Sequence, residues 1–159
     1  MSENPQNSTG DSVIAPLTAE DLEAVIAIDR ALSGVSRRGF FEKRLAAALE
    51  EPGDFVYVGL RQGQTLVGYA LARLVEGEFG KPGARAVFDA IGVDSAHQGQ
   101  SAGRKLLSAV GDVLRHKGVG ELSSQLEWAN QNLIGFFAAA GFAIAPRVVL
   151  TRSTDQPLS

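Results

Sequence analysis

The fold of this chain is decided by one stretch, residues 91–107, which reads Ile91-Gly92-Val93-Asp94-Ser95-Ala96-His97-Gln98-Gly99-Gln100-Ser101-Ala102-Gly103-Arg104-Lys105-Leu106-Leu107. An apolar run ends at Asp94, a loop of small and polar residues follows, and helical spacing then begins. This order predicts a strand, a loop and a helix. The first N–H groups of a helix have no partner inside it, so the loop predicts a site for a phosphate-bearing ligand.

Two better-known phosphate motifs do not fit this loop. Its glycines stand at 92, 99 and 103, which is not the spacing of a dinucleotide-binding fingerprint. No Gly-Lys-Ser/Thr sequence closes it, so it is not a P-loop either. A loop that only packs a strand against a helix would have a similar composition. The loop by itself therefore leaves a ligand site and a packing connection open.

Length and composition predict one globular domain. The chain has 159 residues, 45% of them hydrophobic and 21% charged, which is ordinary for a globular protein. We expect a single domain over residues 12–152, with a disordered leader at 1–11 and a flexible tail at 153–159.

Charge and residue usage exclude several function classes. The net charge of −3 argues against nucleic acid as a partner. No apolar stretch is long enough for a membrane span, and no signal pattern precedes the domain, so we expect a cytoplasmic protein without a membrane partner. The chain has no cysteine and only two histidines, His97 and His116, so we expect no metal site.

The whole chain predicts elements in the order β-α-α-β-β-β-α-β-α-β. The expected strands cover residues 13–15, 54–60, 65–74, 86–93, 122–127 and 142–151. The expected helices cover residues 18–32, 40–49, 100–116 and 132–139. A turn at 61–64 predicts an antiparallel hairpin, and the later strand–helix–strand unit makes the sheet mixed. The expected class is α/β, with a mixed, mainly antiparallel sheet flanked by helices.

Two motifs resemble one known family. Residues 98–104 resemble motif A of the GCN5-related N-acetyltransferase (GNAT) superfamily, which is Arg or Gln, two residues, Gly, one residue, then Gly or Ala. Ser101 stands where the middle glycine is usual. Residues 130–142, an asparagine followed by aromatic residues and Gly-Phe, resemble motif B. The resemblance covers about residues 13–151 and implies the GNAT fold, in which two central strands splay apart.

The resemblance implies an acetyl-CoA site. Ile91 and Val93 would pair with the pantetheine arm like an added strand, and the Val93 N–H would polarise the thioester carbonyl. Asn130 would hydrogen-bond the pantetheine, and Phe137 would line the site. Backbone N–H groups of the loop would bind the pyrophosphate, through Gln98, Gly99, Gln100, Ser101, Ala102, Gly103 and Arg104.

The proton-transfer groups of the family are missing from this sequence. Phe137 occupies the position of a tyrosine that often serves as general acid, and Gln125 that of a glutamate that serves as base in one branch. We expect the base to be Asp89, on the same strand and in register with Ile91, or else Glu127. Asp89 as a structural carboxylate and Glu127 as a solvated strand end are the competing interpretations.

Three functions remain open at this point: an N-acetyltransferase, a coenzyme-A-binding sensor with little chemistry, and an interaction domain. For an enzyme, the implied acceptor is an amine. Arg37-Arg38 would suit an acidic acceptor and Glu76 with Glu78 a cationic one, although both pairs are equally compatible with ordinary solvated charges. Trp128 would pack near the cofactor or at the contact of a possible homodimer.

Overall fold

The computed structural model of the protein describes residues 11–77, 80–99 and 101–158. The chain divides into two compact units, Met1–Gln125 and Leu126–Ser159. The predicted leader lies outside the described residues except for Asp11, and the single domain over 12–152 stays a prediction.

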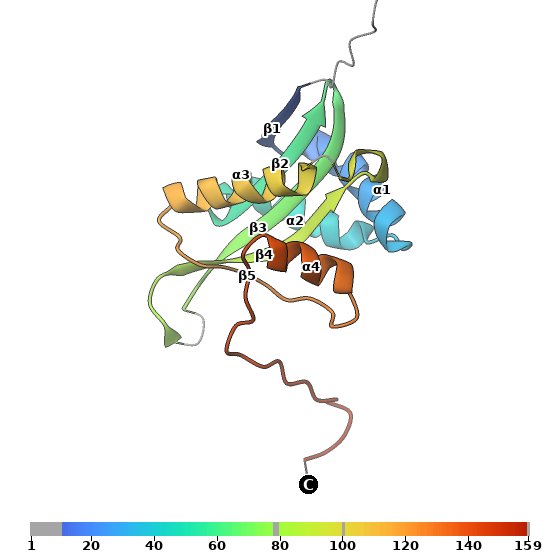
Figure 1. The fold of residues 1–159 in the computed structure, drawn as a ribbon. Coiled ribbons are helices and arrows are strands. Elements are labelled where there is room, and N and C mark those ends of the chain that lie inside the picture. The colour runs from blue at the N-terminus through green and yellow to red at the C-terminus, as the bar shows by residue number, and fades with distance from the viewer. Residues whose placement is uncertain (1–10, 78–79, 100, 159) are drawn as a thin grey trace, which may run out of the picture. The chain divides into compact units, whose positions relative to one another are not determined.

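The first unit is built on a five-stranded sheet (Figure 1). Its strands lie side by side in chain order: β1 Ser12–Pro16, β2 Phe55–Gln62, β3 Thr65–Glu76, β4 Ala84–Val93 and β5 Leu122–Ser124. The first four pair antiparallel, whereas β4 and β5 pair in parallel. The mixed, mainly antiparallel sheet predicted from the sequence is therefore confirmed.

Helices cover both faces of this sheet (Figure 1). Helices α1 Leu22–Ser33 and α2 Arg38–Glu50 pack on one face through a buried cluster that includes Val25, Phe41 and Tyr69. Helix α3 Ala102–His116 packs on the other face, with four apolar residues buried at helical spacing: Ala102, Leu106, Val110 and Leu114. A short 3₁₀ turn, Ser95–His97, connects β4 to the loop before α3.

Strand β4 contains a bulge at Asp89. Phe88 pairs with Ala72 and Ala90 pairs with Leu71, which leaves Asp89 without a partner of its own on β3. A bulge inserts one extra residue and so changes the alternation of side chains between the two faces.

The bulge overturns one prediction about Asp89. Its carboxylate contacts Arg44 of α2, on the α1–α2 face of the sheet. A Cβ built at Gly68 would touch both α3 and the side chain of Val93, which places Val93 on the α3 face. Ile91 shares that face because it stands two residues before Val93. The prediction that Asp89 is in register with Ile91 and Val93 is wrong, since the extra residue breaks the period of two.

The last part of the chain also differs from prediction. Strand β5 ends at Ser124 instead of 127. The final strand predicted over 142–151 does not form in the described structure: these residues take no strand pairing, and Pro146 cannot donate to a strand ladder. Four apolar side chains of this segment are exposed, namely Ile144, Val148, Val149 and Leu150. Three of these residues, Ile144, Val148 and Val149, are β-branched and so favour a strand, but strand propensity by itself supplies no partner strand.

The second unit contains helix α4, Gln131–Ala139. Asn130 begins the helix, because its side-chain oxygen accepts a hydrogen bond from the Leu133 N–H at 3.2 Å. Among the described residues, no helix combines the length and the apolar character that a membrane crossing requires.

Candidate functional site

The start of α3 offers unsatisfied backbone donors. The first helical hydrogen bond runs from the Lys105 N–H to the Ser101 carbonyl at 3.0 Å. The three preceding N–H groups, at 102–104, therefore have no partner within the helix. Ser101, the N-cap residue, makes no side-chain capping hydrogen bond to a described residue. Together with the partial positive charge of a helix N-terminus, these donors suit an anionic group.

The loop before α3 is shaped by left-handed backbone conformations. Gly99 has φ 79°, which glycine adopts without strain. Ser101 has φ 62° and is the one non-glycine residue with positive φ in the described chain. A side chain in this region costs about 1–2 kcal/mol, so the serine at the family's glycine position stores some strain. Gln100, between them, lies outside the described residues.

The end of β4 has one edge without a strand partner. β5 pairs only with residues 86–88 of β4, so β4 continues to Val93 with no described strand on that side. The Asp94 N–H donates to the Val67 carbonyl of β3 at 2.8 Å. Successive residues of a strand point their backbone groups to opposite edges, so the Val93 and Ile91 N–H groups face the open edge. Strands β4 and β5 therefore stop pairing after Phe88, as expected for the two central strands that splay apart in this fold.

Side chains of the loop hold the strand end in place. The Gln98 amide nitrogen donates to the Val93 carbonyl at 2.9 Å. The two ring nitrogens of His97 lie 2.9 Å from the Asp94 carboxylate and 2.7 Å from the Gln62 amide oxygen. Gln98 thus fixes the direction of the Val93 carbonyl, and the N–H of the same residue points to the same edge of β4, the one that β5 leaves unpaired.

An open hollow of about 440 Å³ adjoins the start of α3. Its lining comes from β1 and α3 and includes Ser101, Arg104 and Lys105. It does not include β4, so it is separate from the edge at Ile91 and Val93. Two cationic side chains beside the free N–H groups add to the preference for an anion.

Asp89 is buried between two arginines. Its carboxylate, 6% exposed, lies 3.1 Å from Nε of Arg73 and 3.5 Å from Nε of Arg44. The Tyr57 hydroxyl is buried and has no hydrogen-bond partner among the described residues. Burial and the Asp89 charge raise the pKa of Tyr57, so its hydroxyl keeps its proton at neutral pH.

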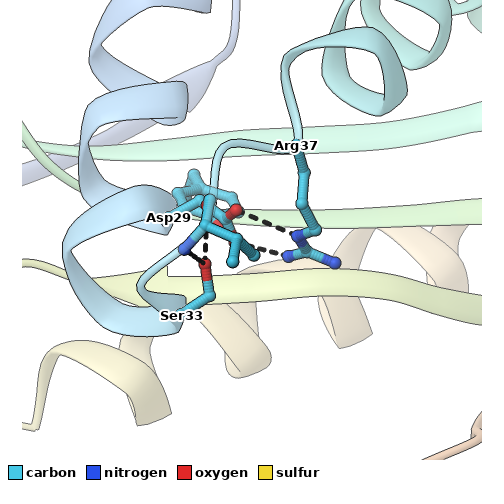
Figure 2. Close-up of polar contacts among 5 residues, drawn as sticks. Asp29, Ser33 and Arg37 are labelled. Carbon is cyan, nitrogen blue, oxygen red and sulfur yellow. Dashed lines mark hydrogen bonds and ion pairs between the residues drawn. The ribbon is translucent and has the colours of Figure 1, made fainter.

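A second buried carboxylate, Asp29, connects α1 to α2 (Figure 2). Arg37 binds both of its oxygens, through Nε at 2.9 Å and through Nη2. The Tyr69 hydroxyl donates to the same carboxylate at 3.1 Å. Burial, followed by the Asp29 charge, raises the pKa of Tyr69. Tyr69 also lies against Gly92, one residue before the strand end.

The second unit holds the remaining predicted residues. Glu127 and Trp128 are exposed, and the Glu127 carbonyl accepts the Asn130 N–H at 2.9 Å. Phe137 is buried and packs on Phe142, with ring centroids 4.8 Å apart. Asn130 already uses its side-chain oxygen to cap α4, which leaves its amide N–H groups for a ligand.

Sequence reasoning missed the polar cluster on the α1–α2 face. It named Asp89 but none of the groups around it: Arg44, Tyr57 and Arg73. Asp29 did carry a signal, since it follows Ile28 on the buried side of an amphipathic helix, where a carboxylate needs a partner. In the part of the chain that the structure describes, no three His, Asp or Glu side chains gather as a metal site would require.

A strand edge beside a helix N-terminus, on a mixed five-stranded sheet, is the arrangement expected from the resemblance to N-acetyltransferases. The sequence profile of the acetyltransferase (GNAT) family matches residues 22–142, so the chain belongs to that family. Comparison with curated protein sequences finds no match.

Solved structures of similar fold act on different amines. An aminoglycoside 6′-N-acetyltransferase from Acinetobacter haemolyticus aligns with a TM-score of 0.74 and 15% identity, over 89% of this chain and 98% of that one. A ribosomal-protein-alanine N-acetyltransferase from Brucella melitensis aligns at 0.72 and 15%, over 90% and 99%. An aminoglycoside N-acetyltransferase in complex with CoA aligns at 0.73 and 19%, over 91% and 95%.

Proposed function

We propose that this protein transfers the acetyl group of acetyl-CoA to a primary amine. The observation that carries the proposal is the open edge of β4 at Ile91 and Val93, next to the uncapped start of α3. An extended arm that ends in a pyrophosphate needs these two features: strand-like backbone partners and a helix N-terminus. Similar structures that hold CoA and acetylate amines support the same choice.

The cofactor would be held mainly by backbone groups. Residues of the loop and first turn, 98–104, would bind the pyrophosphate, and Ile91 with Val93 would pair with the pantetheine arm. The Asn130 amide would hydrogen-bond that arm, and Phe137 would contribute an apolar wall. The Gln98 side chain would act indirectly: it binds the Val93 carbonyl and so fixes the direction of the Val93 N–H.

Acetyl-CoA supplies an activated acyl group, and the chain would position the reactants around it. The Val93 N–H would donate to the carbonyl oxygen as negative charge develops there. The amine nitrogen would bond to the carbonyl carbon, the C–S bond would break, and the electron pair would leave with the thiolate. Orientation and the oxyanion donor would supply most of the rate enhancement, because Phe137 has no proton to give.

The amine must lose a proton to a base, directly or through water. Asp89 and Glu127 are the two candidates. Oδ1 of Asp89 accepts a hydrogen bond from Arg73, and Oδ2 is buried 3.5 Å from Arg44 without a hydrogen-bond partner among the described residues. The charges of both arginines stabilise the ionised carboxylate and so oppose its taking a proton from an amine. Glu127 is exposed and free of that opposition. We therefore favour Glu127 as the base and Asp89 as the anchor of the two arginines.

Two measurements test this function. Millimolar acetyl-CoA should raise the melting temperature, since a ligand that binds only the folded state stabilises it. Free-thiol release should then follow on addition of an amine from a panel of amino acids, peptides, amino sugars, polyamines and aminoglycosides. Binding without turnover on any amine would favour the sensor function, and no thermal shift would reject both.

A further inference from the structure

Three arginines gather on the α1–α2 face of the sheet, and we call Arg37, Arg44 and Arg73 the arginine cluster. Arg37 and Arg44 lie over the ring of Phe40, with guanidinium carbons 5.3 Å and 5.4 Å from its centroid. Asp89 joins Arg44 to Arg73. The cluster therefore forms one connected row from the start of α2 to the bulge of β4.

The charges of this row are arranged with the cations outward. The side chains of Arg37, Arg44 and Arg73 are 42%, 33% and 33% exposed, whereas those of Asp29 and Asp89 are each 6% exposed. The three arginines together with Asp29 and Asp89 carry one net positive charge, on a chain whose net charge is −3. A molecule that approaches this face meets guanidinium groups, and the carboxylates lie beneath them.

The cluster also has unused donors. The closest contacts to Asp89 come through Nε of each arginine, and within the described structure no hydrogen bond joins the terminal nitrogens of Arg44 or Arg73 to a carboxylate. Beside them the buried Tyr57 hydroxyl, which keeps its proton, has no acceptor among the described residues. A buried donor without an acceptor is costly unless a ligand or water supplies one. Guanidinium forks and a hydroxyl donor together match the oxygens of a carboxylate or phosphate.

The position of the cluster connects it to the reaction. Asp89 precedes Val93 by four residues on β4, which places the two α-carbons roughly 13 Å apart along an extended strand. The cluster lies on the α1–α2 face, opposite to α3, whose N-terminus would hold the cofactor phosphates. An acceptor on this face would meet the arginines with one end while its amine reaches the strand end.

We propose, on the basis of the acetyl transfer proposed above, that the acceptor is an amine that also carries a carboxylate or phosphate. This anionic group would bind Arg44, Arg73 and the Tyr57 hydroxyl. Polycationic amines such as aminoglycosides would be repelled by the same groups. The competing explanation is that the arginines serve only to hold α2 on the sheet through Asp29 and Asp89.

The first test compares wild-type activity on matched acceptors. Each pair has the same amine with and without an anion: a dipeptide against its C-terminal amide, and glucosamine 6-phosphate against glucosamine. We expect kcat/KM to be at least tenfold higher for the acid in one pair, and the pair that responds distinguishes carboxylate from phosphate. Equal or better turnover of the neutral partners, or preference for an aminoglycoside, would overturn the proposal.

The second test measures protein variants on the substrate pair that the wild-type protein prefers. Arg44→Gln and Arg73→Gln should each raise KM for the acid about tenfold or more and leave KM for its neutral partner within twofold. Arg38→Gln is the matched control, because Arg38 lies on the same helix and pairs with Glu23 and Glu42 outside the cluster. Unchanged KM in folded Arg44 and Arg73 variants would leave the cluster a structural role only.

A thermal shift with acetyl-CoA distinguishes failure of the anionic acceptor from failure of the proposed acetyl transfer. A protein that binds acetyl-CoA and acetylates neutral amines but ignores the anion would keep the proposed function and lose the acidic acceptor. A protein that neither binds acetyl-CoA nor releases thiol would lose the proposed function itself.

Discussion

The ring of Tyr69 fills the space that a side chain at Gly92 would need. A Cβ at Gly92 would lie 2.7 Å from Cε1 of Tyr69 and 3.0 Å from its hydroxyl oxygen. Tyr69 is fully buried and its hydroxyl is bound to Asp29, so it cannot move aside freely. The residue before the proposed oxyanion donor is thus fixed by a network that begins on α1.

Gly92→Ala should therefore destabilise the protein. Overpacking a filled site costs about 1–3 kcal/mol, and denaturant unfolding would measure the loss. The matched control is Gly111→Ala, because Gly111 lies within α3 and a Cβ added there would have no neighbouring atom within 4 Å. That change should stabilise the helix by about 1 kcal/mol. A Gly92→Ala protein as stable as wild type would mean that Tyr69 is not held as described.

Ser101 offers a graded test of the loop. Ser101→Gly would remove the strain at φ 62°, partly offset by the higher entropy of glycine in the unfolded chain. Ser101→Val would increase the strain, because β-branched residues are the least tolerant of positive φ. We expect acetyl-CoA affinity to fall in the order Gly, Ser, Val, by several-fold at the last step. Calorimetric titration measures it, and a valine variant that binds as tightly as glycine would contradict a role for this backbone conformation.

The two base candidates should behave differently on neutralisation. Glu127→Gln should lower kcat/KM about tenfold or more and alter its pH profile, as expected for loss of a general base. Asp89→Asn should instead lower stability by about 1–3 kcal/mol, because it weakens the pairing with Arg44 and Arg73. Rates that change less than severalfold in both variants would show that neither residue is the base.

Alkaline pH should unfold the protein through its tyrosines. The chain has two, Tyr57 and Tyr69, and burial raises the pKa of both in the folded state. A raised folded pKa contributes stability that is complete below the unfolded pKa of about 10 and is lost as pH rises above it. Tyrosinate absorbance should therefore appear together with loss of helical circular dichroism. Tyrosinate that forms below the unfolding transition would contradict the burial of these hydroxyls.

Tyr57→Phe and Tyr69→Phe show which of the two hydroxyls contributes more to the free energy of unfolding. It removes one titrating group whose hydroxyl has no partner among the described residues, so neutral-pH stability should change little or rise slightly. Tyr69→Phe removes the hydrogen bond to Asp29 and should cost about 1 kcal/mol. Equal losses for the two variants would indicate that Tyr57 has an acceptor in solution.

Much of this architecture could be predicted from local pattern. The apolar run that ends at Val93, the small-residue loop and the amphipathic spacing from Leu106 onward each depend on neighbours in the chain. The two motifs at 98–104 and 130–142 add the family, which the sequence profile confirms. The same local information failed at 142–151, because a strand exists only where a second strand pairs with it.

The sequence by itself determined the order of helices and strands from β1 to α4 and the loop of small residues before α3. It also predicts, through the family resemblance, that Phe137 and Gln125 replace the usual acid and base. Only the tertiary structure decided that a bulge turns Asp89 away from the face of Val93 and into the arginine cluster. Arg44 and Arg73 come from a helix and a strand far apart in the chain, and no periodicity links them. Their meeting at one carboxylate follows from the packing of α2 on the sheet, and a buried charge that needs a counter-charge makes it necessary.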